Sequence, residues 1–328
     1  MTTTSTPGKR RTIRFGNRQQ LQQILAFTGL VVIFGFFSFA SPYFLDWGNV
    51  KGILLATAVT GIMALGATFV IATGGIDLSV GTGMTLCSVM TAVFLANLGL
   101  PLAVGVLGGL AIGALIGLVN GLNVSYLRLP PFIATLATMM IAQGLSLVIS
   151  GTKPIYFSDV GGFDQIAAGE LIPELPNAVL IFFVAAAIAG LVMSKTLTGR
   201  YALSIGSNEE ATAISGVNVR RWKVVIYVVA GLFTGLAGVV LASRLNSAQP
   251  GLGLGYELEA IAAVVIGGTS LRGGKATILG TVIGALIMAT LTNGLRIMSI
   301  PQEWQRVAVG IVIIMAVYAD QLRRGKEA

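Results

Sequence analysis

The stretch Pro101-Leu-Ala-Val-Gly-Val-Leu-Gly-Gly-Leu-Ala-Ile-Gly-Ala-Leu-Ile-Gly-Leu-Val-Asn-Gly121 contains no charged side chain. In a helix, about 20 mostly apolar residues are enough to cross the hydrocarbon core of a bilayer. Glycines recur at every fourth position and so share one helix face, where the missing side chains let another backbone approach closely. They are Gly105, Gly109, Gly113, Gly117 and Gly121. The stretch therefore predicts a tightly packed membrane helix, with a structural role for its glycines rather than a binding role.

Similar apolar runs occur on both sides of this stretch, along most of the 328 residues. Only 10% of the residues are charged and 55% are hydrophobic, whereas a soluble domain carries about 25% charged residues. We therefore expect an all-α integral membrane protein, a polytopic bundle of about ten transmembrane helices. The eighth run is short for a full span, so it is either a half-helix or starts earlier. The runs lie at 21–40, 50–72, 80–97, 101–121, 131–149, 177–194, 224–242, 257–268, 277–295 and 304–319.

With ten spans, both chain ends fall on one side of the membrane. That arrangement places sixteen of the 21 lysines and arginines on the side of the termini and five on the other side. Because basic residues concentrate in cytoplasmic loops, we expect cytoplasmic N- and C-termini. Residues 1–20 would form a basic tail, 21–319 the transmembrane domain and 320–328 a C-terminal tail. We expect these basic residues to lie near membrane lipid and not to bind nucleic acid.

The sequence excludes most kinds of catalytic machinery. Its one cysteine, Cys87, cannot form an internal disulfide, and the absence of histidine excludes histidine-dependent catalysis, metal ligation and proton relays. Gly274-Lys275 invites comparison with a phosphate-binding loop. However, Thr269 stands where that pattern requires glycine, and Ala276 stands where it requires serine or threonine. We expect no catalytic, cofactor or metal site, and no ATP hydrolysis by this chain.

Acidic residues are scarce in the apolar runs, and each lies at the end of a run, where a carboxylate can reach interfacial water. Asp77 precedes an apolar run, so an N-cap is the preferred interpretation and a substrate ligand the alternative. Carriers driven by protons or sodium usually need charges deep in the membrane, so the pattern argues against an ion-coupled carrier. The four residues are Asp77, Glu257, Glu259 and Glu303.

Residues 74–81 and 267–274 share the spacing GG-x-x-L-x-x-G. Broken apolar segments at corresponding positions of two halves point to transporter folds that are built from repeats. The predicted topology places both copies on the same side of the membrane, which an inverted repeat does not allow. The similarity is therefore either chance or a sign that a neighbouring segment does not cross the membrane fully.

The largest loop on the side of the termini, residues 195–223, contains a candidate short helix. Ser207 or Asn208 can cap its start, and Gly216 can end it. Glu209-Glu210 would form its first turn. Because an isolated helix of two turns is marginal in water, it needs a neighbour, either this protein's own surface or another subunit. The plainer alternative is a solvated connecting loop.

Three motifs lie in order along the chain. They are Thr73-Gly-Gly-Ile-Asp-Leu-Ser-Val-Gly81, Gly206-Ser-Asn-Glu-Glu-Ala-Thr212 with Ser215-Gly-Val217, and Arg244-Leu-Asn-Ser-Ala-Gln-Pro250 through Gly255-Tyr-Glu-Leu-Glu-Ala-Ile-Ala-Ala-Val-Val-Ile-Gly-Gly-Thr269. Together they resemble the ribose-type sugar permeases of ATP-binding-cassette (ABC) importers, over nearly the whole chain. The resemblance implies the ABC importer permease fold, the bacterial cytoplasmic (inner) membrane, and a monosaccharide substrate, which is a ribose-like pentose, a hexose or a polyol.

The resemblance also implies three protein partners. They are a second permease subunit, identical or similar, a cytoplasmic ABC ATPase that binds the ATP, and an extracytoplasmic sugar-binding protein. Residues 208–216 match the family's coupling helix, which sits in a groove of the ATPase. The residues expected to couple are Asn208, Glu209, Glu210, Ala211, Ser215 and Gly216.

The translocation pathway is expected to run between two permease subunits and, without deep charges, to be lined by weakly polar groups. Thr135, Gln143 and Asn293 are candidates because they are polar within apolar runs, and Asp77 is a fourth. Hydrogen bonding between helices is the alternative role for the first three. Two other functions stay open: a permease of the same fold for nucleosides or branched-chain amino acids, and an ion-coupled carrier or channel that acts alone.

Overall fold

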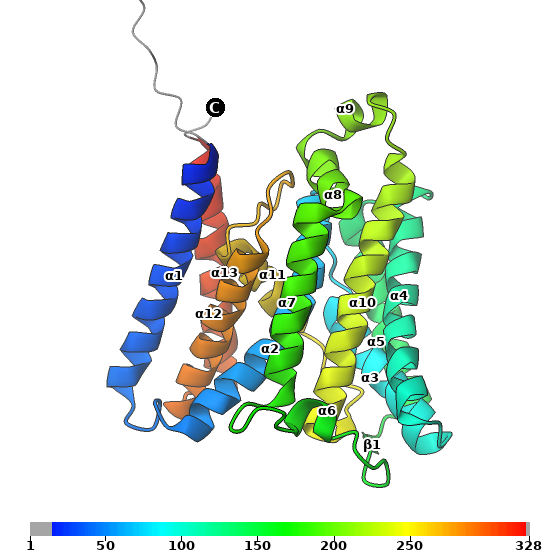
Figure 1. Ribbon diagram of the computed structural model, residues 1–328, viewed down its shortest axis with the longest axis vertical. Coiled ribbons are helices and arrows are strands. Elements are labelled where there is room, and N and C mark those ends of the chain that lie inside the picture. The colour runs from blue at the N-terminus through cyan, green and yellow to red at the C-terminus, as the bar shows by residue number, and fades with distance from the viewer. Residues whose placement is uncertain (1–14, 326–328) are drawn as a thin grey trace, which may run out of the picture.

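The computed structural model describes residues 15–325, and the parts of the predicted tails beyond these limits lie outside the described residues. As predicted, the fold is all-α (Figure 1). A π-helical turn, η1 (Val93–Asn97), extends α3, and the short strands β1 (Ile155–Tyr156) and β2 (Ser247–Ala248) pair antiparallel. The α-helices are α1 (Phe15–Ala40), α2 (Trp47–Ala72), α3 (Val80–Ala92), α4 (Leu102–Ser125), α5 (Pro131–Ser150), α6 (Gln165–Ala168), α7 (Asn177–Lys195), α8 (Leu197–Ser207), α9 (Glu209–Ile214), α10 (Val219–Leu245), α11 (Tyr256–Ile266), α12 (Ile278–Ile297) and α13 (Gln302–Gly325).

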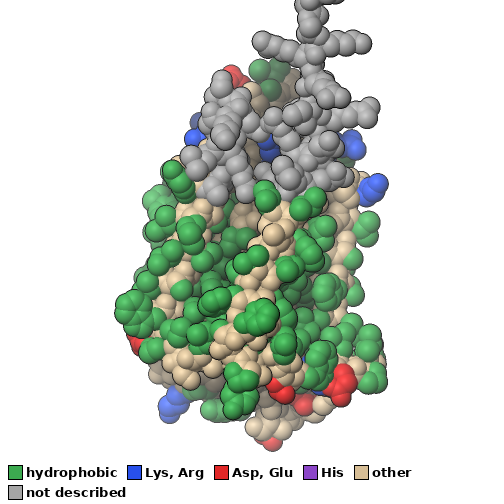
Figure 2. Space-filling model, turned by 90° about the vertical axis from the view of Figure 1, so that its left-hand side faces the viewer, with side chains coloured by type: hydrophobic (Ala, Val, Ile, Leu, Met, Phe, Trp, Pro, Cys, Tyr) green, Lys and Arg blue, Asp and Glu red, His purple; other side chains and the backbone are tan. Residues whose placement is uncertain are grey.

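The long helices stand side by side in a bundle (Figure 1). α1 begins and α13 ends at the end of the bundle where α8 and α9 lie, which we call the α9 end. β1 and α6 lie at the opposite end, the β1 end. Hydrophobic side chains cover one side of the bundle between its ends, as a lipid-facing surface requires (Figure 2). Eight described helices are long and apolar enough to cross a membrane, namely α1, α2, α3 with η1, α4, α5, α7, α10 and α12. The chain is a multi-pass membrane protein.

All ten predicted apolar runs are helical, but the eighth does not span a membrane by itself. It forms α11, which has 11 residues. At 1.5 Å per residue, α11 extends about 16 Å, roughly half the thickness of the hydrocarbon core. Of the two possibilities that the short run left open, the half-helix is the one found. The tenth run forms α13, which is not one of the eight described helices that are long and apolar enough to cross a membrane.

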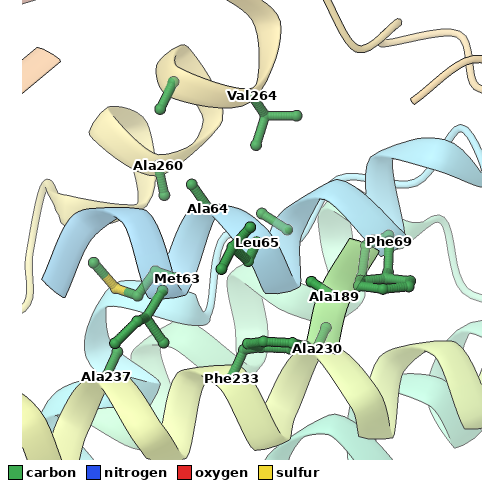
Figure 3. Packing of buried hydrophobic residues seen from close by; sticks show 14 of the residues in the cluster. Met63, Ala64, Leu65, Phe69, Ala189, Ala230, Phe233, Ala237, Ala260 and Val264 are labelled. Carbon is green, nitrogen blue, oxygen red and sulfur yellow. The ribbon is translucent and has the colours of Figure 1, made fainter. Parts of the chain in front are cut away.

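α2 lies at the centre of the bundle, where every residue of 57–72 is buried. One side of α2 packs against α10, and the rings of Phe69 and Phe233 stack with their centroids 6.1 Å apart. Ala260 and Val264 of α11 lie on the other side of α2 (Figure 3). A helix that is buried on all sides must be apolar on all sides, which explains why α2 contains so few polar residues.

The glycines of α4 pack against α10, as their spacing predicted. A Cβ added to Gly113 would lie only 2.7 Å from the Cα of Gly235 on α10. A Cβ added to Gly117 would lie 2.9 Å from the Cα of Val228. Gly105, near the start of α4, packs against a side chain of η1 rather than against α10. Any larger residue at the middle positions would force the α4 and α10 backbones apart.

Two non-helical breaks enter the bundle from opposite ends and meet inside it. The first break, residues 73–79, follows α2 at the α9 end and leads into α3. The second break, residues 249–255, leads from β2 into α11. Gly81, at the start of α3, packs against the second break, and Gly83 lies beside Thr234, which is midway along α10. Interrupted helices that meet near the middle of a bundle are typical of transporters.

The similarity between residues 74–81 and 267–274 reflects the way in which α2 and α11 end. Gly74 and Gly268 follow the two helices with φ of 81° and 90°. In each case the next amide donates a 3.2 Å hydrogen bond to a carbonyl of the last helical turn, as in a Schellman cap. Gly74 therefore corresponds to Gly268 rather than to Gly267, one residue from the register that the sequence suggested. α11 is the neighbouring segment that does not cross fully.

Candidate functional site

The predicted short helix forms as α9. The Oδ1 of Asn208 accepts a hydrogen bond from the amide of Ala211 at 2.9 Å, so Asn208 rather than Ser207 is the cap. Ser215 is the C-cap residue, and Gly216 after it has φ of 84°, which glycine adopts without strain. Signals within nine residues of sequence thus define both ends of the helix.

α9 stands at the tip of the α9 end, beyond the ends of α7 and α10 (Figure 1). Every side chain of α9 is exposed except Thr212, and Ile214 is 81% exposed. The carboxylate of Glu209 pairs with the ammonium of Lys223 on α10 at 2.7 Å, whereas Glu210 is exposed. The protruding helix therefore offers a neighbour a mostly polar surface with one large apolar side chain.

α8 connects α9 to the end of α2 and to the loop after α11 through a junction that was not predicted. Gly206, in the last turn of α8, packs against the backbone of Ala72 and of Gly273. The amide of Gly274 donates a hydrogen bond to the carbonyl of Ala72 at 3.0 Å. Because backbones touch here without intervening side chains, a displacement of α8 must move the end of α2 and the loop after α11. The only sequence signal was the glycine at each contact point.

The Asp77 carboxylate is buried in the first break, with the residue only 5% exposed. Its Oδ1 accepts hydrogen bonds from the Ser79 amide at 2.8 Å and from the Ser79 hydroxyl at 2.6 Å. Asn120 of α4 donates to the same hydroxyl at 2.8 Å. Ser79, not Asp77, is the N-cap residue of α3, so the predicted cap was wrong by two residues. The expectation that Asp77 reaches interfacial water was also wrong, because the first break lies inside the bundle.

The other predicted pathway residues are not gathered at one place. The Thr135 hydroxyl accepts from the Leu78 amide at 3.1 Å and donates to the Ile76 carbonyl at 3.2 Å, which ties the first break to α5. Gln143 is half-buried farther along α5. Asn293 is half-buried on α12, and its Oδ1 is buried without a partner among the described residues. Their roles as pathway lining stay predictions.

A second carboxylate is buried at the second break. Glu257 is 6% exposed, and its two oxygens accept from the Gly255 amide at 3.0 and 3.1 Å. Glu259 is half-buried, and Glu303 at the start of α13 is exposed, as expected of a helix end. For Glu257 the expected access to interfacial water was wrong, because α11 begins inside the bundle. The lack of deep charges therefore no longer argues against an ion-coupled carrier.

Comparisons with known proteins show the family to which the chain belongs. A protein-family model described as "Branched-chain amino acid transport system / permease component" matches residues 49–317. The chain belongs to this permease family.

The permease is 42% identical over 302 residues to the ribose import permease protein RbsC of Bacillus subtilis. The matched region covers 92% of this chain and 93% of RbsC. Two Escherichia coli proteins are also similar to the permease over most of their length. The L-arabinose transport system permease protein AraH is 39% identical over 90% of each chain, and the D-allose transport system permease protein AlsC is 37% identical over 89% of each. No solved structure matches the permease significantly.

The permease also holds unused hydrogen-bonding atoms beside the first break. The Oδ1 of Asn120 and the hydroxyl of Tyr227 are buried without partners among the described residues. A Cβ added to Gly75 would lie 3.0 Å from that hydroxyl, so Tyr227 borders the first break. Buried polar atoms without partners are uncommon in folded proteins. A segment that exchanges its contacts between two packing states would find new partners in these atoms.

Proposed function

We propose that the permease is the membrane-spanning subunit of an ABC importer that carries a monosaccharide into the cytoplasm. The observation that carries the proposal is the 42% identity to RbsC over 92% of the chain. The names of the similar proteins include ribose, L-arabinose and D-allose, so a pentose or a hexose fits equally with family membership. Identity alone does not separate these sugars, because AraH at 39% falls between RbsC of Bacillus subtilis at 42% and RbsC of Escherichia coli at 38%.

The geometry of α8 and α9 supports a transporter that is powered from outside the chain. In this proposal α9 docks in a groove of a cytoplasmic ABC ATPase, which binds the ATP. ATP binding moves α9 and α8, and Gly206 passes the displacement to Ala72 and to the loop that contains Gly273. Ala72 ends α2, which leads into the first break, and the loop that contains Gly273 follows α11, which begins at the second break. A movement of α2 and α11 would therefore move both breaks. Tightly packed backbones switch between discrete arrangements, as alternating access requires.

The remaining parts of the importer follow from the same proposal. A second permease subunit, identical or similar, completes the pathway in the bacterial inner membrane. The α9 end faces the cytoplasm, which the excess of lysine and arginine on the side of the termini supports. An extracytoplasmic sugar-binding protein delivers the sugar to the β1 end. Thr135, Gln143 and Asn293 are proposed to contribute polar groups to the pathway.

The substrate class is tested with the complete transporter in vesicles that also contain its ATPase and its binding protein. ATP hydrolysis is measured after addition of ribose, L-arabinose, D-allose, leucine or adenosine. We expect at least one monosaccharide to stimulate hydrolysis several-fold, and leucine and adenosine to have no effect. Stimulation by leucine or adenosine without stimulation by any sugar would contradict the proposal and would favour the amino-acid or nucleoside alternative.

A further inference from the structure

A cavity of about 440 Å³ opens beside α9, where α4 ends and α5 and α10 begin. Three basic side chains line it, and one carboxylate, that of Glu209, accompanies them. Arg128 lies in the turn between α4 and α5, and Arg220 and Lys223 lie in the first turns of α10. Because three membrane spans end at this cavity, it lies at the level where lipid headgroups meet the protein.

Other features of the cavity also suit an anion. Pro131 and Val219, the first residues of α5 and α10, both line it, so the N-terminal ends of two helices, which carry a positive partial charge, adjoin the cavity. Ser125 lines it as well and is 5% exposed, and its hydroxyl is buried without a partner among the described residues. The cavity thus combines cationic side chains, helix N-termini and a spare hydroxyl donor.

We propose that this cavity binds the phosphate of an anionic phospholipid. A phosphate oxygen accepts several charge-assisted hydrogen bonds at once, which matches the guanidinium and ammonium groups around the cavity. Leu127 and Phe132, close to the cavity in the chain, are 67% and 50% exposed, so apolar surface is available for the acyl chains. Arg128 has φ of 57°, where glycine would be less strained, which is consistent with a role for its guanidinium.

A lipid at this position would act on α9. Lys223 lines the cavity and also holds Glu209, the first residue of α9, at 2.7 Å. A phosphate in the cavity competes with Glu209 for the Lys223 ammonium and so loosens the contact between α9 and α10. The inference goes beyond the proposed function, since lipid binding by this cavity does not depend on the identity of the transported solute.

The experiment uses the purified full-length permease and counts bound lipids by native mass spectrometry. Dioleoylphosphatidylglycerol is titrated, with dioleoylphosphatidylcholine as the neutral lipid. We expect the first phosphatidylglycerol to bind more tightly than phosphatidylcholine. The double variant Arg128→Gln/Arg220→Gln should weaken that binding about 25-fold, at about fivefold for each basic residue near an anionic headgroup. Arg221→Gln should leave it unchanged, because Arg221 adjoins Arg220 on α10 but does not line the cavity.

Three outcomes would overturn the proposal. The first is equal phosphatidylglycerol binding by the wild type and the double variant. Arg128→Lys/Arg220→Lys, which keeps the charges, and thermal melting check that the variants fold. The second is displacement of the lipid by millimolar inorganic phosphate, which would identify soluble phosphate as the ligand. The third is loss of the lipid when the ATPase is added, which would assign the cavity to an acidic side chain of that partner.

Discussion

α9 and the first break are held in place by different kinds of contact. Asn208 caps α9 through an amide three residues away, and the helix is almost wholly exposed. In the first break Asp77 and Ser79 are buried, and besides the hydrogen bonds between them the partners come from far along the chain. Asn120 is 41 residues from Ser79, and Thr135 is 57 residues from Leu78. The difference teaches that the segment offered to a partner is formed locally, whereas the segment that must rearrange depends on long-range contacts that can be exchanged.

The largest expected effect comes from a charge reversal on α9. Glu210→Lys changes an exposed side chain, so membrane insertion and thermal stability should stay within about 0.5 kcal/mol of the wild type. Sugar uptake should fall to background because the ATPase no longer docks. Co-purification of the ATPase and uptake by vesicles are the measurements. Asp159→Lys, an exposed reversal at the β1 end, is the control and should co-purify with the ATPase as the wild type does. Normal association of the ATPase with Glu210→Lys would remove α9 from the coupling path.

The next largest effect tests the junction of α8 with the end of α2 and the loop after α11. In Gly206→Ala the new methyl group meets the Ala72 backbone, so α8 must shift. We expect uptake to fall more than tenfold and stability to fall by about 1–3 kcal/mol, as for other overpacked sites. The ATPase should still bind, because α9 itself is unchanged. Gly190→Ala on α7 is the matched control, since its methyl group enters open space. Uptake at the wild-type rate in Gly206→Ala would show that this junction does not transmit movement.

A smaller effect is expected inside the first break. Asp77→Leu leaves the amide and hydroxyl of Ser79 without their acceptor and should destabilise the permease by about 1–3 kcal/mol. Asp77→Asn keeps an acceptor oxygen and should cost less. Both variants should bind the ATPase, which separates the break from α9. The measurements are thermal melting and ATPase co-purification, and the same stability loss in both variants would show that the charge, not the hydrogen bonds, matters.

The smallest effect concerns a surface contact at the β1 end, which involves neither α9 nor the first break. A hydrogen bond from the Lys51 ammonium, together with the indole N–H of Trp47, lowers the pKa of the Glu174 carboxyl below its usual 4.5. A lowered folded-state pKa adds stability above pH 4.5, and that stability is lost as the pH falls through the lowered value. We expect a slight decrease of the melting temperature in this acidic range, and none in Glu174→Gln. An equal decrease in that variant would assign the acid sensitivity to other groups.

Local and periodic features could be predicted from the sequence, and the interior could not. The cap and the end of α9 follow from residues close to it in the chain, Asn208 and Gly216, and the packing face of α4 follows from a regular glycine spacing. Asp77 and Glu257, in contrast, lie at the ends of apolar runs and were expected near water. They are buried because α3 and α11 begin inside the bundle, so an end in the sequence is not an end at the membrane surface.

The junction at Gly206 lay beyond prediction for a related reason. It brings together the end of α2, the end of α8 and the loop after α11, and these segments are far apart in the sequence. Glycine at a contact point shows that something approaches closely, but the sequence does not say what approaches. The buried atoms of Asn120 and Tyr227 are a similar case, since their lack of partners is a property of the packed structure.

The most direct test measures solute accumulation by vesicles that contain either the permease alone or the complete transporter. We predict that the complete transporter concentrates its sugar only when ATP is supplied on the side of the α9 end. The permease alone should accumulate nothing, whether or not a proton or sodium gradient is imposed. Accumulation of a sugar against its gradient by the permease alone would contradict the claim that its driving energy enters through α9.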